Sequence, residues 1–172
     1  MCAQDEEANV VRGFEWRESR KSVMFVSLES SAQTKTASTY FNVDECRYID
    51  GIVSEILLRN GAEISGKDIG IIAMHRAQVV EMRKLLNENR RVNAKEIEVN
   101  TVDGFQGKEK KLIILSFVRT DGSSTSFLAN PQRCNVALSR AKYGLIVCGQ
   151  LQQLQANRMW AKFAEFVLKH NI

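Results

Sequence analysis

The sequence has a single proline, ten glycines and no long apolar segment among its 172 residues. Collagen-like and low-complexity chains need far more proline and glycine, so both classes are excluded. A hydrophobic share of 44% argues against intrinsic disorder. The longest apolar run, residues 112–118, includes a serine and is too short to span a bilayer, so no membrane partner is expected. One globular domain of ordinary size is predicted.

Cysteine is also scarce, and the four that are present stand apart: Cys2, Cys46, Cys134 and Cys148. None forms a C-x-x-C pair or lies near paired histidines, so no metal site is predicted. The polar, acidic N-terminus does not resemble a secretory signal, and we expect a reducing compartment, the cytoplasm or the nucleus. The formal net charge of +4 permits contact with nucleic acid without requiring it.

Short apolar runs alternate with segments of helical periodicity along the chain. Strands are predicted at residues 23–28, 69–74, 97–101, 112–118 and 145–148. Helices are predicted at residues 42–59, 77–89, 130–142 and 159–169. Continuous apolar strands separated by helices are buried on both faces, which predicts an α/β, three-layer domain with a mostly parallel sheet of about five strands.

Polar segments complete the predicted organisation. Residues 1–20 are charged and aperiodic, which predicts a loosely ordered lead-in to a domain over residues 21–172. Residues 29–39 and 121–126 are rich in serine, threonine or glycine, which predicts loops. In open parallel sheets, ligands bind at the carboxyl ends of the strands. We therefore expect the functional residues to share that edge of the sheet.

The first candidate segment, residues 101–109, reads T-V-D-G-F-Q-G-K-E and follows a predicted strand. Its glycines let the backbone approach a ligand closely and direct N–H groups at anions. Thr101 can donate a hydrogen bond to a phosphate, and Glu109 can accept hydrogen bonds from a ribose. A polar turn before the next strand explains the same composition.

The second candidate segment, residues 130–142, begins with Asn130 and Pro131, which predict an N-cap and a first helical residue. Arg133 and Arg140 are seven residues apart, close to two helical turns, so we expect both on one face of the helix. Two such guanidinium groups suit a phosphate chain. A solvated basic face is the alternative interpretation.

The third candidate segment, residues 69–78, predicts a strand followed by a helix, with His75 and Gln78 at the junction. Both can contact a ligand at the N-terminus of the helix, although a lone histidine there is also compatible with a structural role. The sequence contains no phosphate loop of the form G-x-x-x-x-G-K-[ST], no G-x-S-x-G elbow and no H-E-x-x-H motif.

Taken in order, these segments resemble motifs IV, V and VI in the C-terminal RecA-like lobe of superfamily 1B helicases, of the up-frameshift and senataxin type. Residues 99–120 resemble motif V and its following strand. Residues 130–149 resemble motif VI, with A-L-S-R-A-K-Y-G where the family has A-L-T-R-A-R-Y-G. Residues 69–78 resemble motif IV, although A-M-H replaces the family's T-P-Y. The resemblance covers residues 13–150 and implies a RecA-like fold.

The resemblance implies a nucleotide site that is shared with a first lobe. Arg140 matches the arginine finger of motif VI, a catalytic residue that reaches the γ-phosphate of ATP. Glu109 matches the residue that contacts the ribose, and Gly107 matches the backbone position near the phosphates. Gln106 is expected to sense the nucleotide. We expect the carboxyl edge of the sheet to bring Glu109 and Arg140 together.

The same resemblance implies residues that contact nucleic acid. Thr101 matches the motif V residue that contacts the nucleic-acid backbone, and Asp103 occupies a polar position of that motif. His75 and Gln78 are the motif IV candidates for such contact. Arg133 is similar to a basic motif VI residue with a structural or interlobe role.

The family implies that the chain is the second motor lobe of an ATP-dependent RNA or DNA helicase. The sequence has no Walker motifs, so ATP and its Mg²⁺ are expected to be held by an N-terminal helicase lobe, and the chain alone is expected to be inactive. The expected partners are that lobe and single-stranded RNA or DNA, and the expected state is a monomer. One alternative is a non-catalytic nucleic-acid-binding or helicase-docking module from a truncated helicase gene. Another is a small doubly wound domain that binds an unrelated phosphorylated ligand.

Overall fold

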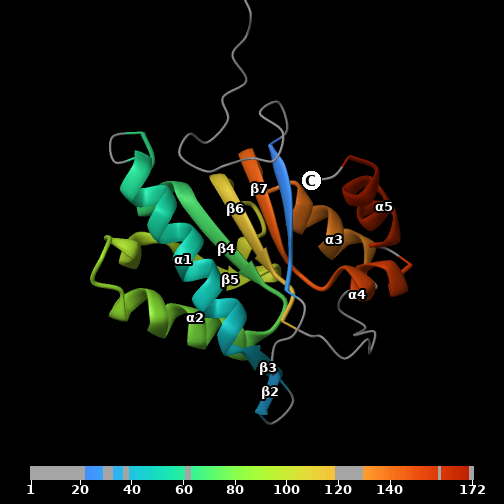
Figure 1. The fold of residues 1–172 in the computed structure, drawn as a ribbon, viewed down its shortest axis with the longest axis horizontal. Coiled ribbons are helices and arrows are strands. Elements are labelled where there is room, and N and C mark those ends of the chain that lie inside the picture. The colour runs from blue at the N-terminus through green and yellow to red at the C-terminus, as the bar shows by residue number, and fades with distance from the viewer. Residues whose placement is uncertain are drawn as a thin grey trace, which may run out of the picture.

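The computed structural model of the chain describes residues 22–28, 33–36, 39–60, 63–118, 130–158 and 160–170. Its centre is a sheet of five parallel strands in the spatial order β1-β7-β6-β4-β5. The strands are β1 (Val23–Ser27), β4 (Ile69–Ala73), β5 (Glu98–Thr101), β6 (Lys110–Ser116) and β7 (Ala141–Gly149). Helices flank this sheet, so the predicted α/β architecture with a parallel sheet is confirmed (Figure 1).

Helices cover the sheet on both sides. One face is covered by α1 (Val43–Asn60) and α2 (Arg76–Glu88), and on the other side lie α3 (Pro131–Leu138), α4 (Leu151–Ala156) and α5 (Ala161–His170) (Figure 1). The short connecting 3-10 helices are η1 (Gly66–Asp68), η2 (Ala94–Glu96) and η3 (Asp103–Phe105). Among the helices that the structure describes, none is long and apolar enough to cross a membrane.

Strand β6 shows why the sheet is encoded as unbroken apolar runs. Leu112 and Ile114 belong to the core under α1 and α2, whereas Ile113 and Leu115 belong to the core on the opposite face. All four side chains are fully buried. A strand between two helical layers therefore needs an apolar side chain at every position. Burial of each such side chain contributes about 1.5–3 kcal/mol to the stability of the fold.

Asparagine side chains start two of the helices, and the cap at Asn130 is the one that the sequence predicts. Asn42 precedes α1, and its Oδ1 accepts a hydrogen bond from the N–H of Glu45 at 3.0 Å. Asn130 precedes α3, and its Oδ1 accepts from the N–H of Gln132 at 2.9 Å and from that of Arg133 at 3.3 Å. Each cap satisfies N–H groups that have no partner within the helix.

The structure corrects two predicted elements and adds one helix. The pair β2 (Gln33–Thr36) and β3 (Thr39–Asn42) forms an antiparallel hairpin in a segment that the sequence predicts as a loop (Figure 1). The helix predicted over residues 130–142 ends at Leu138, because Ala141 already pairs with Lys110 in the sheet. Helix α4 is not predicted at all. The predicted lead-in over residues 1–20 and the predicted loop over residues 121–126 lie outside the described residues.

The cap of α3 gives a first testable prediction. Asn130→Ala removes the oxygen that accepts two N–H groups, so we expect the free energy of unfolding to fall by about 1 kcal/mol. Asn130→Asp keeps an acceptor in that position and should retain most of the stability. Urea denaturation followed by circular dichroism measures both. An alanine variant as stable as the parent would contradict the cap.

Candidate functional site

The chain between β5 and β6 connects two opposite edges of the sheet. Thr101 ends β5 beside Ala73, the last residue of β4, at the edge where strands end (the carboxyl edge). Glu109 directly precedes β6, at the edge where strands begin (the amino edge). Between them, Phe105 is fully buried over β4, where a Cβ on Gly70 would lie 2.8 Å from its ring. The nine-residue motif therefore supplies Thr101 to one edge and Glu109 to the other.

Glu109 and Arg140 lie together at the amino edge, at the starts of the neighbouring strands β6 and β7. The Lys110 N–H donates to the Arg140 carbonyl at 3.1 Å, and Arg140 Nη1 donates to the Lys108 carbonyl at 3.4 Å. The prediction that the carboxyl edge brings the two residues together is wrong. Both residues precede their strands, and parallel strands begin at the same edge.

Arg140 does not lie on α3, which ends at Leu138. Its side chain turns back over the last turn of that helix, where Nε donates to the Val136 carbonyl at 3.1 Å and Nη2 to Ser139 Oγ at 2.8 Å. A cation at this position interacts favourably with the helix dipole. The expected common helix face of Arg133 and Arg140 is therefore wrong, because sheet pairing ends the helix before Arg140.

Arg133 instead ties α3 to η3. Its Nε donates to Asp103 Oδ1 at 3.0 Å and its Nη2 to Asp103 Oδ2 at 2.9 Å, a bidentate ion pair. The pair is largely exposed, so its energy is small, but its fork geometry fixes how the two segments meet. Beside it, Gln106 and Gln132 line a polar cleft of about 260 Å³ between η3 and α3.

The turn that precedes β6 requires glycine. Gly107 has a φ of +76°, in the left-handed region, and it is exposed together with Gln106 and Lys108. Side chains rarely tolerate this backbone conformation, whereas glycine does so at little cost. The backbone of the turn therefore stays open to an approaching ligand, next to Glu109.

Charge around Glu109 and Arg140 is predominantly basic. Lys142 Nζ lies 3.5 Å from Glu109 Oε2, and both side chains are half exposed. Glu98 is paired with Lys108 and Lys110. Partial burial by itself raises the pKa of Glu98. The ammonium groups of the two lysines lower it by more, so the pKa of Glu98 lies below its usual value. Near Arg140, Glu98 and Glu109 thus face three lysines and Arg140, and farther along the same edge Asp68 and Glu96 are each paired with a lysine. The balance near Arg140 favours an anionic ligand.

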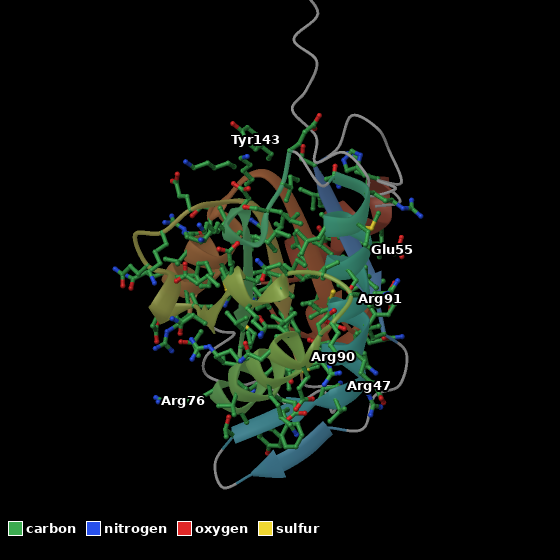
Figure 2. All side chains as sticks on the ribbon, turned by 90° about the vertical axis from the view of Figure 1, so that its left-hand side faces the viewer. Arg47, Glu55, Arg76, Arg90, Arg91 and Tyr143 are labelled. Carbon is green, nitrogen blue, oxygen red and sulfur yellow. The ribbon has the colours of Figure 1, made fainter. Side chains whose placement is uncertain are left out.

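The carboxyl edge receives His75 and Thr101 but not Gln78. His75 lies between β4 and α2, with its ring 5.4 Å from that of Tyr40. Gln78 is fully buried: its Oε1 accepts from the Asn42 N–H at 2.8 Å, and its Nε2 donates to Ser116 Oγ at 2.9 Å. The predicted direct contact between Gln78 and nucleic acid is therefore wrong, because the side chain faces the core. Figure 2 shows the two edges at opposite ends of the molecule, with Tyr143 at the amino edge and Arg76 at the carboxyl edge.

Comparison with known proteins tests the family resemblance that the motifs suggest. Residues 1–152 match a family described as an AAA domain. The chain belongs to this family. Helicase SEN1 of Saccharomyces cerevisiae is 38% identical over 149 residues, which cover 82% of the chain and 7% of that protein. The regulator of nonsense transcripts 1 homolog of Drosophila melanogaster is 30% identical over 171 residues, which cover 96% of the chain and 14% of that protein.

Probable helicase senataxin of Homo sapiens is 35% identical over 133 residues, which cover 75% of the chain and 5% of that protein. The chain thus spans between 5% and 14% of the length of these three relatives. The resemblance to the C-terminal lobe of superfamily 1B helicases, of the up-frameshift and senataxin type, is confirmed. This AAA domain is a helicase-type domain with a RecA-like fold.

Sequence analysis missed two buried polar residues of this AAA domain, Glu45 and Ser116. Glu45 is 1% exposed, and its carboxylate accepts hydrogen bonds from Ser116 Oγ and from the Val118 N–H. Burial raises the pKa of Glu45 to about 7, although these hydrogen bonds oppose the shift. A signal was present in the sequence, because Glu45 precedes Ile49 by four residues in the apolar stripe of the predicted helix.

Two glycines of the AAA domain provide a matched test of the turn geometry. We expect Gly107→Ala to lower the free energy of unfolding by about 1 kcal/mol, because its φ is positive. Gly51→Ala should raise the free energy of unfolding by about 0.5–1 kcal/mol, because Gly51 is an exposed residue within α1 and a Cβ there meets nothing within 4 Å. Chemical denaturation measures both, and equal effects of the two substitutions would contradict the assigned turn.

Proposed function

We propose that this chain is the second motor lobe of an ATP-dependent helicase. Its amino edge completes an ATP site held by a first lobe, and its carboxyl edge contacts a single-stranded nucleic acid. The observation that carries the proposal is the pairing of β6 with β7, which places Glu109 and Arg140 side by side at the amino edge. A nucleotide presented from outside that edge can meet both side chains at once.

Arg140 suits the role of an arginine finger for a chemical reason. The three hydrogen bonds that position its guanidinium go to neutral oxygens, on Val136, Ser139 and Lys108. Among the described residues no carboxylate is paired with it in an ion pair, so its charge stays available for an anion. Such a cation stabilises the negative charge that develops on the γ-phosphoryl group during its transfer.

Neighbouring residues match other parts of a nucleotide. Glu109 is half exposed and can accept hydrogen bonds from ribose hydroxyl groups. The exposed backbone at Gly107 lets a phosphate approach closely, whereas the N–H groups of Gln106 and Lys108 already donate to the carbonyls of Asp103 and Phe105. Gln106, beside α3, is suited to report whether the nucleotide is bound. The chain has no phosphate loop, so in this proposal the first lobe supplies that loop and holds Mg²⁺.

The carboxyl edge is proposed to grip the nucleic-acid backbone. Thr101 ends β5 and His75 follows the neighbouring strand β4, and both residues are partly exposed. Asp103 remains a predicted contact, although its carboxylate already pairs with Arg133. Contacts of this kind reach phosphate and sugar groups, so RNA or DNA of any sequence is expected to bind.

Hydrolysis of ATP tests the amino edge. We expect negligible turnover by the chain alone and measurable turnover when a separately produced superfamily 1 first lobe and single-stranded RNA are added. Arg140→Ala should then lower kcat by about 10³-fold or more, because the transition-state charge loses its cation. Arg140→Lys restores a charge without the planar fork, and only partial recovery is expected.

The matched control is Arg91→Ala, which should leave turnover unchanged. Arg91 is an exposed arginine that lies beside α1 in Figure 2. Turnover by the isolated chain that is lost in Arg140→Ala would contradict a site shared between two lobes. Turnover of the two-lobe mixture that is indifferent to Arg140→Ala would contradict the arginine finger.

Binding of nucleic acid tests the carboxyl edge. We expect labelled single-stranded RNA or DNA to bind the chain more tightly when the first lobe and a non-hydrolysable ATP analogue are present. The affinity should fall with increasing salt, because phosphate contacts release counterions. Fluorescence anisotropy at two salt concentrations measures both effects. Equal affinity with and without the first lobe would favour a free-standing binding module over a motor lobe.

A further inference from the structure

A closed ring of hydrogen bonds lies inside the protein at the end of β6. The Asn42 N–H donates to Gln78 Oε1 at 2.8 Å, and Gln78 Nε2 donates to Ser116 Oγ at 2.9 Å. Ser116 Oγ then donates to Glu45 Oε1, and the Glu45 N–H donates back to Asn42 Oδ1 at 3.0 Å. All four residues are buried, with exposures between 0% and 1%. The ring joins the start of α1, the first turns of α2 and the last residue of β6.

The ring holds Val118 in an unusual conformation. The Val118 N–H lies 3.2 Å from each Glu45 carboxylate oxygen, and its carbonyl accepts from Asn42 Nδ2 at 3.4 Å. Val118 has a φ of +71°, the only positive φ at a non-glycine residue in the described part of the chain. A β-branched residue in the left-handed region is strained. Such strain persists only where surrounding contacts impose it, and it is frequently found at functional sites.

The strained residue stands at the carboxyl edge, among the residues proposed to contact nucleic acid. Ser116 pairs with Ala73, the last residue of β4, and the Met74 N–H donates to the Ser116 carbonyl at 3.0 Å. Ala73 in turn pairs with Thr101, and His75 follows Met74. The ring therefore lies directly behind the edge that carries Thr101 and His75.

We propose that Glu45 is a positioning residue for nucleic-acid binding. It acts through Val118 and Gln78, which hold the residues after β6 and the first turn of α2 in the conformation that binds the nucleic acid. This inference rests on the proposed function of the carboxyl edge. Glu45 touches no ligand itself, because its side chain is enclosed by protein.

A carboxylate is suited to this position because it offers two acceptor oxygens to the Val118 N–H while one also accepts from Ser116. The ionised form accepts more strongly than a neutral group does. Burial raises the pKa of Glu45 to about 7, so both protonation states are populated near neutral pH. The titratable groups around it are the Cys46 thiol of α1, the Cys148 thiol of β7 and, beyond Cys46, Glu81 of α2.

Stability and binding should respond to pH in opposite directions. The pKa of Glu45 rises from 4.5 to about 7 on folding, so the folded state holds an extra proton between these values. Its contribution to stability is complete below about pH 4.5 and is lost as the pH rises through 7. The grip on Val118, by contrast, strengthens as Glu45 ionises. A residue that only supported the fold would lose binding and stability together.

The test compares the chain with its Glu45→Gln and Ser116→Ala variants, bound to the first lobe and a non-hydrolysable ATP analogue. Glutamine keeps one acceptor oxygen but replaces the second with an amide that cannot accept from Val118. We expect Glu45→Gln to weaken binding of a labelled single-stranded RNA about tenfold at pH 8 and less at pH 6. Urea denaturation should show that this variant is as stable as the parent at pH 8, or more stable.

Ser116→Ala breaks the same ring, so its effect on affinity should not add to that of Glu45→Gln. The control is Ser54→Ala, which removes a buried hydroxyl group on α1 that accepts a hydrogen bond from Asn89. This variant should lower the free energy of unfolding and leave the affinity for nucleic acid unchanged. Affinity that is indifferent to Glu45→Gln at both pH values would overturn this inference alone. A parent chain that binds no nucleic acid even with the first lobe would overturn the proposed function, and this inference with it.

Discussion

Strand β6 is held in parallel between β4 and β7, and the arrangement of both edges depends on this pairing. Its first residue, Lys110, pairs with Ala141 at the start of β7, which brings Glu109 beside Arg140. Its last residue, Ser116, pairs with Ala73 and with Cys148 at the carboxyl edge. The pairing of β6 with β7 is continuous from Leu112 to Ser116, after an irregularity between Lys110 and Leu112. A one-residue shift of this continuous part would move its side chains to the wrong core.

The same strand offers a physical route between the two proposed activities. Its seven residues separate the amino edge from the carboxyl edge by about 20 Å. Because β6 is buried on both faces, we expect it to move together with the sheet around it and not to deform locally. A change in the position of Arg140 relative to a first lobe would then reach Ser116 and the strained Val118 as a displacement of the whole lobe. The buried ring around Glu45 lies at the carboxyl end of this strand.

Much of the fold could be predicted because the strands and long helices have strong periodic signals. The predicted strand over residues 69–74 and the predicted helix over 77–89 match β4 and α2 to within one residue at each end. Prediction failed where the local signal was ambiguous. Residues 139–142 have good helix propensity, yet strand pairing takes the chain from Ala141 onward. The β2–β3 hairpin pairs only with itself, so no apolar run marks it.

By itself, the sequence determined the fold class, the order of the three motifs and the chemical types of the site residues. Tertiary structure alone decided that the strands after Glu109 and Arg140 are neighbours, which brings the two residues together, and that Gln78 faces inward. It also decided that Glu45 is enclosed with Ser116 and Val118. The reason is physical: periodicity reports whether a side chain faces a core or solvent. Which distant partner a residue meets at its edge depends on the path of the chain over β4 and on the order of strands in the sheet.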